Sequence, residues 1–91
     1  PLYSNTSDFY IKLSEFDSSP VQIRIFENRK AVLDLDWDHE HKPYSKGHLH
    51  VHDLVINAKG KIKRKNGRAA TDEETQKYGA LIKKVAPNVQ L

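Results

Sequence analysis

The chain has 91 residues and a formal net charge of +3, and 23 of its residues are Leu, Ile, Val or Phe. That apolar fraction supports one small core, so we expect a single domain over residues 1–91. The absence of Cys excludes disulfide frameworks, thiolate metal sites and thiol nucleophiles, and no apolar run is long enough to span a bilayer. Because the chain begins at Pro1 and contains no Met, we interpret it as a fragment or a processed product.

The first half of the chain alternates apolar and polar residues, which is the period of a half-buried strand. This pattern predicts strands near residues 8–13, 21–26 and 31–37. The last two are separated by Glu27–Lys30, a short polar segment in which Asn28 favours a turn. We therefore expect a hairpin at this point.

Two later segments carry the acids and most of the histidines. Leu33 and Leu35 favour one face of the third strand, which leaves Asp34 and Asp36 on the opposite face. After a polar loop over residues 38–47, a fourth strand is predicted near residues 48–56. There Leu49 and Val51 alternate with three histidines, His48, His50 and His52. All five histidines of the chain fall between His39 and His52.

The last third of the chain predicts a short strand around residues 61–65, a turn at Asn66–Gly67 and a helix near residues 72–86. Thr71 and Glu74 fit a capping box, in which each side chain satisfies a backbone N–H at the start of the helix. The apolar stripe of this helix is Tyr78, Leu81, Ile82 and Val85. The expected fold is α+β, with a small antiparallel sheet of about four strands and one C-terminal helix packed on it.

Strand geometry brings the acids and the imidazoles together. If the third and fourth strands pair antiparallel, one register that keeps both apolar sets on the core places Asp36 opposite His50 and Asp34 opposite His52. A shift by two residues places Asp36 opposite His52 and Asp38 opposite His50. Either register predicts one sheet face with at least two carboxylates and two or three imidazoles.

Such a face suits acid–base chemistry. A carboxylate that accepts from one imidazole nitrogen orients the ring, and the other nitrogen then gives or takes a proton near neutral pH. His50 and His52 are the candidate proton-transfer groups, and Asp34 and Asp36 are the candidate orienters. Arg24, on the polar side of its strand, is a candidate phosphate ligand.

Two other interpretations remain open for the same residues. His48, His50 and His52 alternate on a strand in a pattern that suits Zn²⁺ or Ni²⁺, with His50 and His52 as ligands, His48 or His39 as the third ligand, and Asp36 orienting a ligand from behind. Alternatively, the face is a solvent-exposed ladder in which acids balance imidazoles, and the chain is a non-catalytic, phage-related interaction domain. The acid–base hypothesis needs no cofactor, whereas the metal hypothesis needs Zn²⁺ or Ni²⁺.

The charge of the chain is unevenly distributed. Residues 1–58 carry six Lys or Arg against nine Asp or Glu, a net of −3, and residues 59–91 carry nine against three, a net of +6. Six cations fall within ten residues: Lys59, Lys61, Lys63, Arg64, Lys65 and Arg68. A basic segment attracts polyanions such as RNA, and a solvated, exposed turn is the alternative.

The order and spacing of these motifs resemble a known module. The segments in question are Gln22–Phe26 (QIRIF), Leu33–Trp37 (LDLDW), Asp38–His39 and His50–His52 (HVH). They are similar to a small C-terminal module of phage minor-head proteins and bacterial polymorphic toxins, over about residues 8–56. That module is related to the barnase–EndoU–colicin–RelE group of metal-independent ribonuclease-like folds.

The resemblance implies a function as well as a fold. It implies a ribonuclease-like module associated with a toxin or a prophage, with RNA as substrate and a cognate inhibitor or a parent phage or toxin protein as partner. The site residues that it marks are Arg24, Asp34, Asp36, His39, His50 and His52. Leu49 stands where the module usually has Pro before the first histidine of the final pair. The bacterial cytoplasm or a phage particle is the expected location.

Overall fold

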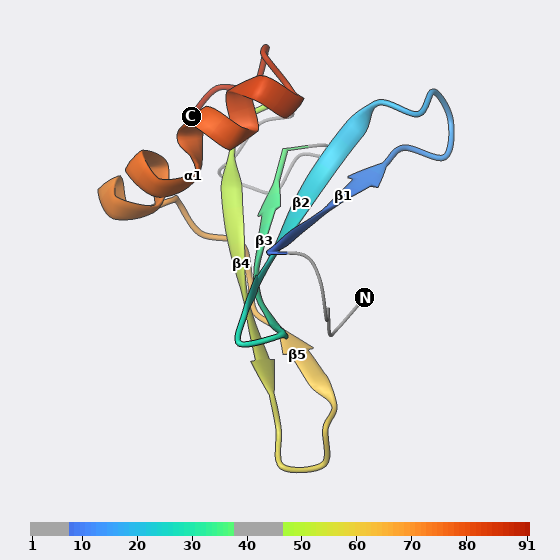
Figure 1. Ribbon diagram of the computed structural model, residues 1–91, viewed down its shortest axis with the longest axis vertical. Helices are drawn as coiled ribbons and strands as arrows, with labels where there is room; N and C mark the ends of the chain where they lie inside the picture. Colours follow the sequence, from blue (N-terminus) through green and yellow to red (C-terminus); the bar gives the residue numbers. More distant parts are fainter. Residues whose placement is uncertain (1–7, 38–46) are drawn as a thin grey trace.

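The computed structural model describes residues 8–37 and 47–91, which form one antiparallel sheet and one helix (Figure 1). The strand order is β1-β2-β3-β4-β5, so each strand pairs with its neighbour in sequence. The elements are β1 (Phe9–Leu13), β2 (Pro20–Glu27), β3 (Lys30–Asp36), β4 (His50–Ile56), β5 (Ile62–Arg64) and α1 (Asp72–Val85). The predicted α+β class is confirmed, and the short segment expected around residues 61–65 supplies a fifth strand.

The β2–β3 hairpin shows why the chain turns where it does. Asn28 and Arg29 occupy the two central positions with φ of 50° and 68°, and Glu27 pairs with Lys30 on either side. Two consecutive positive φ values are the signature of a type I′ turn, whose twist matches that of the strands. Asn tolerates this conformation better than most residues, which explains the predicted turn.

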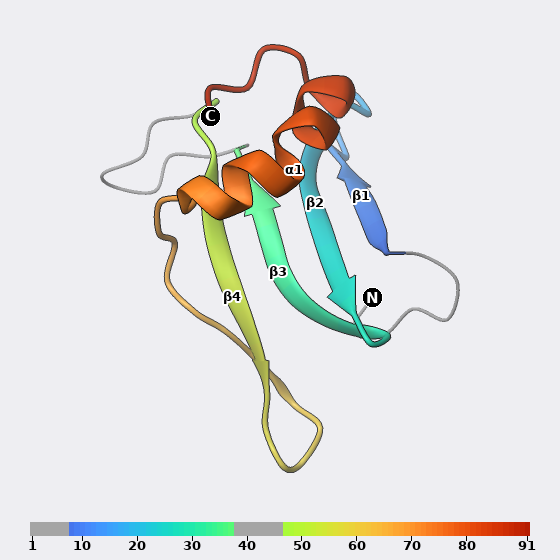
Figure 2. The same cartoon turned by 60° about the vertical axis from the view of Figure 1, so that its left-hand side comes forward.

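One face of the sheet carries the main core. Helix α1 lies across this face, over β2, β3 and β4 (Figure 2). Ile23, Leu35, Val51 and Ile82 are at most 1% exposed, so each of the three strands and the helix contributes one fully buried side chain. Trp37 extends the same core and donates its indole N–H to the Pro20 carbonyl at 3.0 Å. The alternation of the strands therefore places the acids and imidazoles on the face opposite α1.

The start of α1 is fixed by its cap and by an arginine. The Thr71–Glu74 capping box is formed, as predicted. Arg68 donates to both oxygens of Glu74, at 2.8 and 2.9 Å, and to both oxygens of Asp53 on β4, at 2.7 and 3.0 Å. These hydrogen bonds from Arg68 lower the pKa of Glu74 and of Asp53. The arginine thus joins the helix to the sheet.

The segment between β5 and α1 runs alongside β4 instead of turning away. Arg68 and Val51 exchange backbone hydrogen bonds of 2.8 and 2.9 Å, and no turn forms at Asn66–Gly67, in contrast to the prediction. Gly67 has another use. A Cβ there would lie 3.1 Å from Cδ2 of His50 and 3.3 Å from Cε1 of His52, which is closer than most Cβ contacts, so a larger residue would require the rings to shift.

A second, smaller core lies on the face opposite α1. Phe26, Ala31 and Leu54 are buried there, with Ile62 packed against them. This cluster closes one end of the polar face and holds the base of the β4–β5 hairpin. Within residues 8–37 and 47–91, no helix is long and apolar enough to cross a membrane.

Candidate functional site

Two rows of polar side chains cross the sheet on the face opposite α1. The β3–β4 register pairs Asp34 with His52 and Asp36 with His50, which confirms the first of the two predicted registers. The neighbouring registers continue these pairs onto β2 and β1. The rows are Tyr10–Arg24–Asp34–His52 and Lys12–Gln22–Asp36–His50. Each row therefore runs from an exposed edge strand to a buried imidazole.

Asp34 is fully buried and paired with Arg24. Its side chain is 0% exposed, and Arg24 donates through Nε and Nη2 to its two oxygens at 2.7 and 3.0 Å. This bidentate geometry is the strong form of an arginine–carboxylate pair, and it raises the pKa of Arg24. Arg24 keeps one-fifth of its side chain exposed, so the pair connects a buried acid to the surface.

Arg64 on β5 reaches across to both acids. Its Nη2 donates to Oδ2 of Asp36 at 2.8 Å, and its Nε lies 3.3 Å from Oδ2 of Asp34. Its side chain is 38% exposed, whereas those of Asp34 and Asp36 are 0% and 3% exposed. Arg64 therefore lies at the boundary between the buried carboxylates and solvent.

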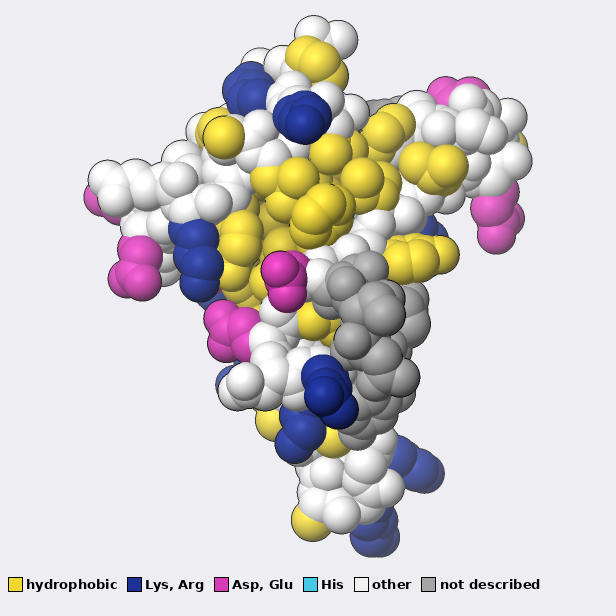
Figure 3. Space-filling view, viewed as in Figure 1, with side chains coloured by type: hydrophobic (Ala, Val, Ile, Leu, Met, Phe, Trp, Pro, Cys, Tyr) yellow, Lys and Arg dark blue, Asp and Glu magenta, His cyan; other side chains and the backbone are white. Residues whose placement is uncertain are grey.

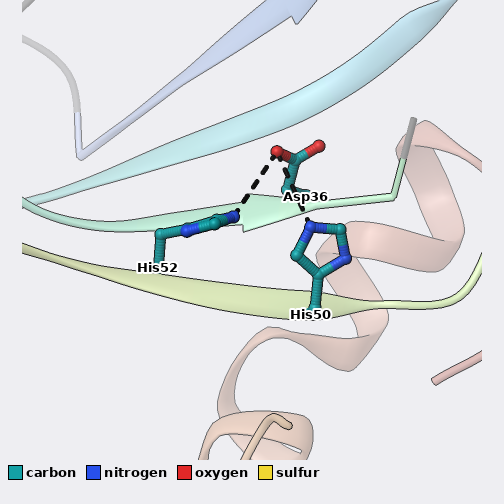
Figure 4. A group of neighbouring side chains, drawn as sticks. All are labelled: Asp36, His50 and His52. Carbon is teal, nitrogen blue, oxygen red and sulfur yellow. Dashed lines mark ion pairs between the residues drawn. The ribbon is translucent and has the colours of Figure 1, made fainter. Parts of the chain in front are cut away.

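The two imidazoles of β4 face one carboxylate oxygen of β3 (Figure 4). Nε2 of His50 and Nε2 of His52 lie 3.9 and 4.0 Å from Oδ2 of Asp36, and the ring centroids are 5.2 Å apart in an edge-on arrangement. Both rings are buried, with 0% and 3% of the residue exposed. Two imidazoles and one carboxylate thus meet in the interior of the protein.

Backbone carbonyls hold the other nitrogen of each ring. Nδ1 of His52 lies 2.7 Å from the Lys65 carbonyl, and Nδ1 of His50 lies 3.4 Å from the His48 carbonyl. Because a carbonyl oxygen only accepts, Nδ1 carries the hydrogen in both contacts. A neutral ring then presents the lone pair of Nε2 toward Asp36. A nitrogen lone pair in this position can act as a base, and it equally suits a metal ligand.

The same three residues meet the distance requirement for a metal site. One ligand atom from each of Asp36, His50 and His52 lies within 4.8 Å of the other two. His48, which the structure also describes, does not belong to this group. It precedes β4 and forms an isolated bridge with Gln90. Asp36, predicted to orient a ligand, is therefore close enough to both imidazoles to be a third ligand itself.

A hollow of about 300 Å³ adjoins the buried cluster. It lies over the exposed halves of the two rows and reaches Asp34. Its lining residues are Tyr10, Lys12, Gln22, Arg24, Asp34 and Arg64. That volume is at the small end for ligand pockets, so the hollow fits a group of the size of one nucleotide.

The structure brings together five of the six residues that the resemblance marks: Arg24, Asp34, Asp36, His50 and His52. The sixth, His39, lies outside the described residues. The burial of both acids and both imidazoles is inconsistent with a solvent-exposed ladder, because such a ladder requires hydrated side chains.

The basic segment divides into two groups. Arg64 and Arg68 pair with acids on opposite faces of the sheet. The lysines are exposed on and beside the β4–β5 hairpin: Lys59, Lys61, Lys63 and Lys65. Figure 3 shows dark blue side chains around the lower end of the molecule, where this hairpin projects. The four lysines and Arg64 are therefore the exposed members of the basic segment, and Arg68 is partly buried.

Sequence analysis missed three residues of the hollow and one residue that covers the rings. Tyr10, Lys12 and Gln22 had no assigned role, although strand alternation places them on the polar side. Gly67 was interpreted as a turn residue. The strand pairings of β1 and of the segment beside β4 would have located all four residues, but no pattern in the sequence determines those pairings.

Comparisons with protein-family models, with curated proteins and with solved structures find no match for this chain.

Proposed function

We propose that the chain is a nucleic-acid-processing, ribonuclease-like module, associated with a toxin or a prophage, that cleaves RNA at the Asp36–His50–His52 cluster. The observation that carries this proposal is the convergence of two imidazoles on the carboxylate of Asp36. Arg64 contacts this carboxylate and that of Asp34, and Arg24 pairs with Asp34. The resemblance supports it, because the residues that the resemblance marks within the described ranges form one contiguous site.

The charges around the cluster suit an RNA substrate. The four exposed lysines of the hairpin region attract phosphates through Coulomb forces and counterion release. Arg24 and Arg64 are planar donors that bind phosphate oxygens in pairs. They stand at the mouth of the buried cluster, next to the hollow. The lysines thus supply nonspecific attraction, and the arginines position one phosphate.

The reaction needs one base and one acid. One imidazole takes the proton of a ribose 2′-hydroxyl, and the 2′-oxygen forms a bond to the adjacent phosphorus. The bond between phosphorus and the 5′-oxygen of the next nucleotide breaks, and that oxygen receives a proton from the second imidazole. The products are a 2′,3′-cyclic phosphate and a 5′-hydroxyl. Asp36 faces both rings and stabilises whichever of them is charged.

Arg64 controls access in this proposal. It is the exposed partner of the Asp36 oxygen that both imidazoles face. When a substrate phosphate offers an alternative anion, Arg64 moves from Asp36 to that phosphate. This exchange exposes the cluster and brings a cation to the phosphorus, where it stabilises the negative charge of the transition state.

The test is cleavage of a single-stranded RNA in the presence of EDTA. We expect wild type to release a 2′,3′-cyclic phosphate, and His50→Ala and His52→Ala to lower the rate at least about 100-fold, the usual contribution of acid–base catalysis. His48→Ala is the matched control, because His48 is a neighbouring half-buried histidine outside the cluster. Circular dichroism checks that each variant folds. Absence of cleavage by folded wild type, or equal loss in all three variants, contradicts the proposal.

A second candidate function, metal binding, is favoured by one specific observation. Both Nδ1 atoms face backbone carbonyls, and both Nε2 atoms face Asp36. Ligating histidines commonly show this arrangement in zinc sites. Under this alternative, Asp36, His50 and His52 hold Zn²⁺ or Ni²⁺, and the chain has a metal-stabilised fold.

A thermal-unfolding experiment separates the two candidates. If the cluster is a structural metal site, Zn²⁺ raises the melting temperature of wild type and of His48→Ala, EDTA lowers it, and His52→Ala does not respond. If the melting temperature of wild type is the same with Zn²⁺ and with EDTA, the metal candidate is wrong.

A further inference from the structure

We infer that the hollow beside the cluster is a subsite for one nucleotide of single-stranded RNA, in which Tyr10 stacks a base and Lys12 and Gln22 hold its backbone and its edge. This inference rests on the proposed function, since it names the substrate and the subsite of the same face. None of the three residues belongs to the cluster that performs the proposed chemistry.

The positions of the three residues carry the inference. Tyr10 pairs with Arg24 and Lys12 pairs with Gln22 in the β1–β2 register, so all four side chains occupy one face. Tyr10 is 52% exposed although it lies in a strand, and it lines the hollow. An aromatic ring that is held on a strand and exposed to solvent is a stacking platform for a base.

The polar neighbours match the rest of a nucleotide. Lys12 is an exposed cation on the same edge strand, where it can contact a phosphate. Gln22 is half-buried beside Asp36 and offers an amide that both donates and accepts, which suits the edge of a base. The hollow therefore combines stacking, charge and hydrogen bonding at the scale of one nucleotide.

This geometry favours a single strand over a duplex. A base stacks on a protein ring only when it is unstacked from its own neighbours, which single strands permit and duplexes resist. Tyr10 and His52 are three strands apart, or about 14 Å at the usual strand spacing. The nucleotide held by Tyr10 therefore flanks the reacting phosphate.

The test is binding of a fluorescein-labelled ten-nucleotide single strand in which every ribose carries a 2′-O-methyl group. This probe lacks the 2′-hydroxyl that cleavage needs, so the result does not depend on catalysis. We expect Tyr10→Ala to weaken binding about tenfold and Tyr10→Phe to stay within about twofold of wild type. Lys12→Gln should reduce the slope of log affinity against log salt by about 0.7.

Phe9→Ala is the matched control. Phe9 is an exposed aromatic residue of the same strand, 40% exposed, that pairs with Ile25 and so lies on the other face. We expect it to bind the probe as wild type does, and a duplex of the same sequence to bind more weakly than the single strand. Equal weakening by Phe9→Ala and Tyr10→Ala, wild-type binding by Tyr10→Ala, or equal affinity for the duplex overturns the inference. If cleavage fails but these binding differences hold, the proposed reaction alone is wrong.

Discussion

The two faces of the sheet each carry an arginine bound to two acids, and the two networks differ in burial. Beside α1, Arg68 holds Asp53 and Glu74, and all three side chains are between 17% and 38% exposed. On the opposite face, Arg64 spans Asp34 and Asp36, which are 0% and 3% exposed.

This difference indicates different roles. A partly exposed arginine network keeps its water and joins the helix to the sheet at little cost. A buried network loses the hydration of its charges, and apolar residues of similar size often give equal or greater stability. Stability alone therefore explains the Arg68 network, whereas the Asp34–Asp36 network fits the chemistry that we propose at the adjoining imidazoles.

The largest effect is expected from removing a buried acid. Asp34→Ala removes the buried carboxylate that Arg24 and Arg64 contact and leaves their positive charges without this partner. It should therefore lower the free energy of unfolding by about 3–5 kcal/mol. Asp53→Ala, in the exposed network, should cost about 1 kcal/mol or less. Urea unfolding of both variants measures the difference. Equal losses would remove the distinction between the two networks.

An intermediate effect is expected at Gly67. Gly67→Ala places a methyl group against both imidazoles, and overpacking of this kind costs about 1–3 kcal/mol. It should also reduce RNA cleavage, because the rings must move relative to Asp36. Asn66→Ala, at the exposed neighbouring residue, is the control for both readouts. A Gly67→Ala protein with wild-type stability and activity would show that the close packing is unimportant.

The smallest effect is a dependence of stability on pH from the Arg68 network. Arg68 lowers the folded-state pKa of Asp53 and of Glu74 below their ordinary values of 3.8 and 4.5. Their contribution is therefore complete above about pH 5 and is lost as the pH falls through the lowered folded-state values. Arg68→Gln should flatten the decline in melting temperature between about pH 5 and pH 2. An unchanged decline would mean that other carboxylates cause it.

The parts of the fold that follow local rules were predictable from the sequence. Alternation placed Asp34, Asp36, His50 and His52 on one face, and the capping box located the start of α1. Burial was not predictable, because it depends on Arg64 reaching across from β5 and on Gly67 passing beside the rings. Contacts of that kind join segments far apart in sequence and leave no periodic pattern.

The central claim is that the buried polar face is maintained for chemistry. Its most direct test is the double variant His50→Leu/His52→Leu, which fills the same space with apolar side chains and leaves Asp36 paired with Arg64. Urea unfolding and RNA cleavage in EDTA are measured on the same preparation. The account predicts a folded protein that no longer cleaves RNA. Cleavage at the wild-type rate by the double variant would contradict it.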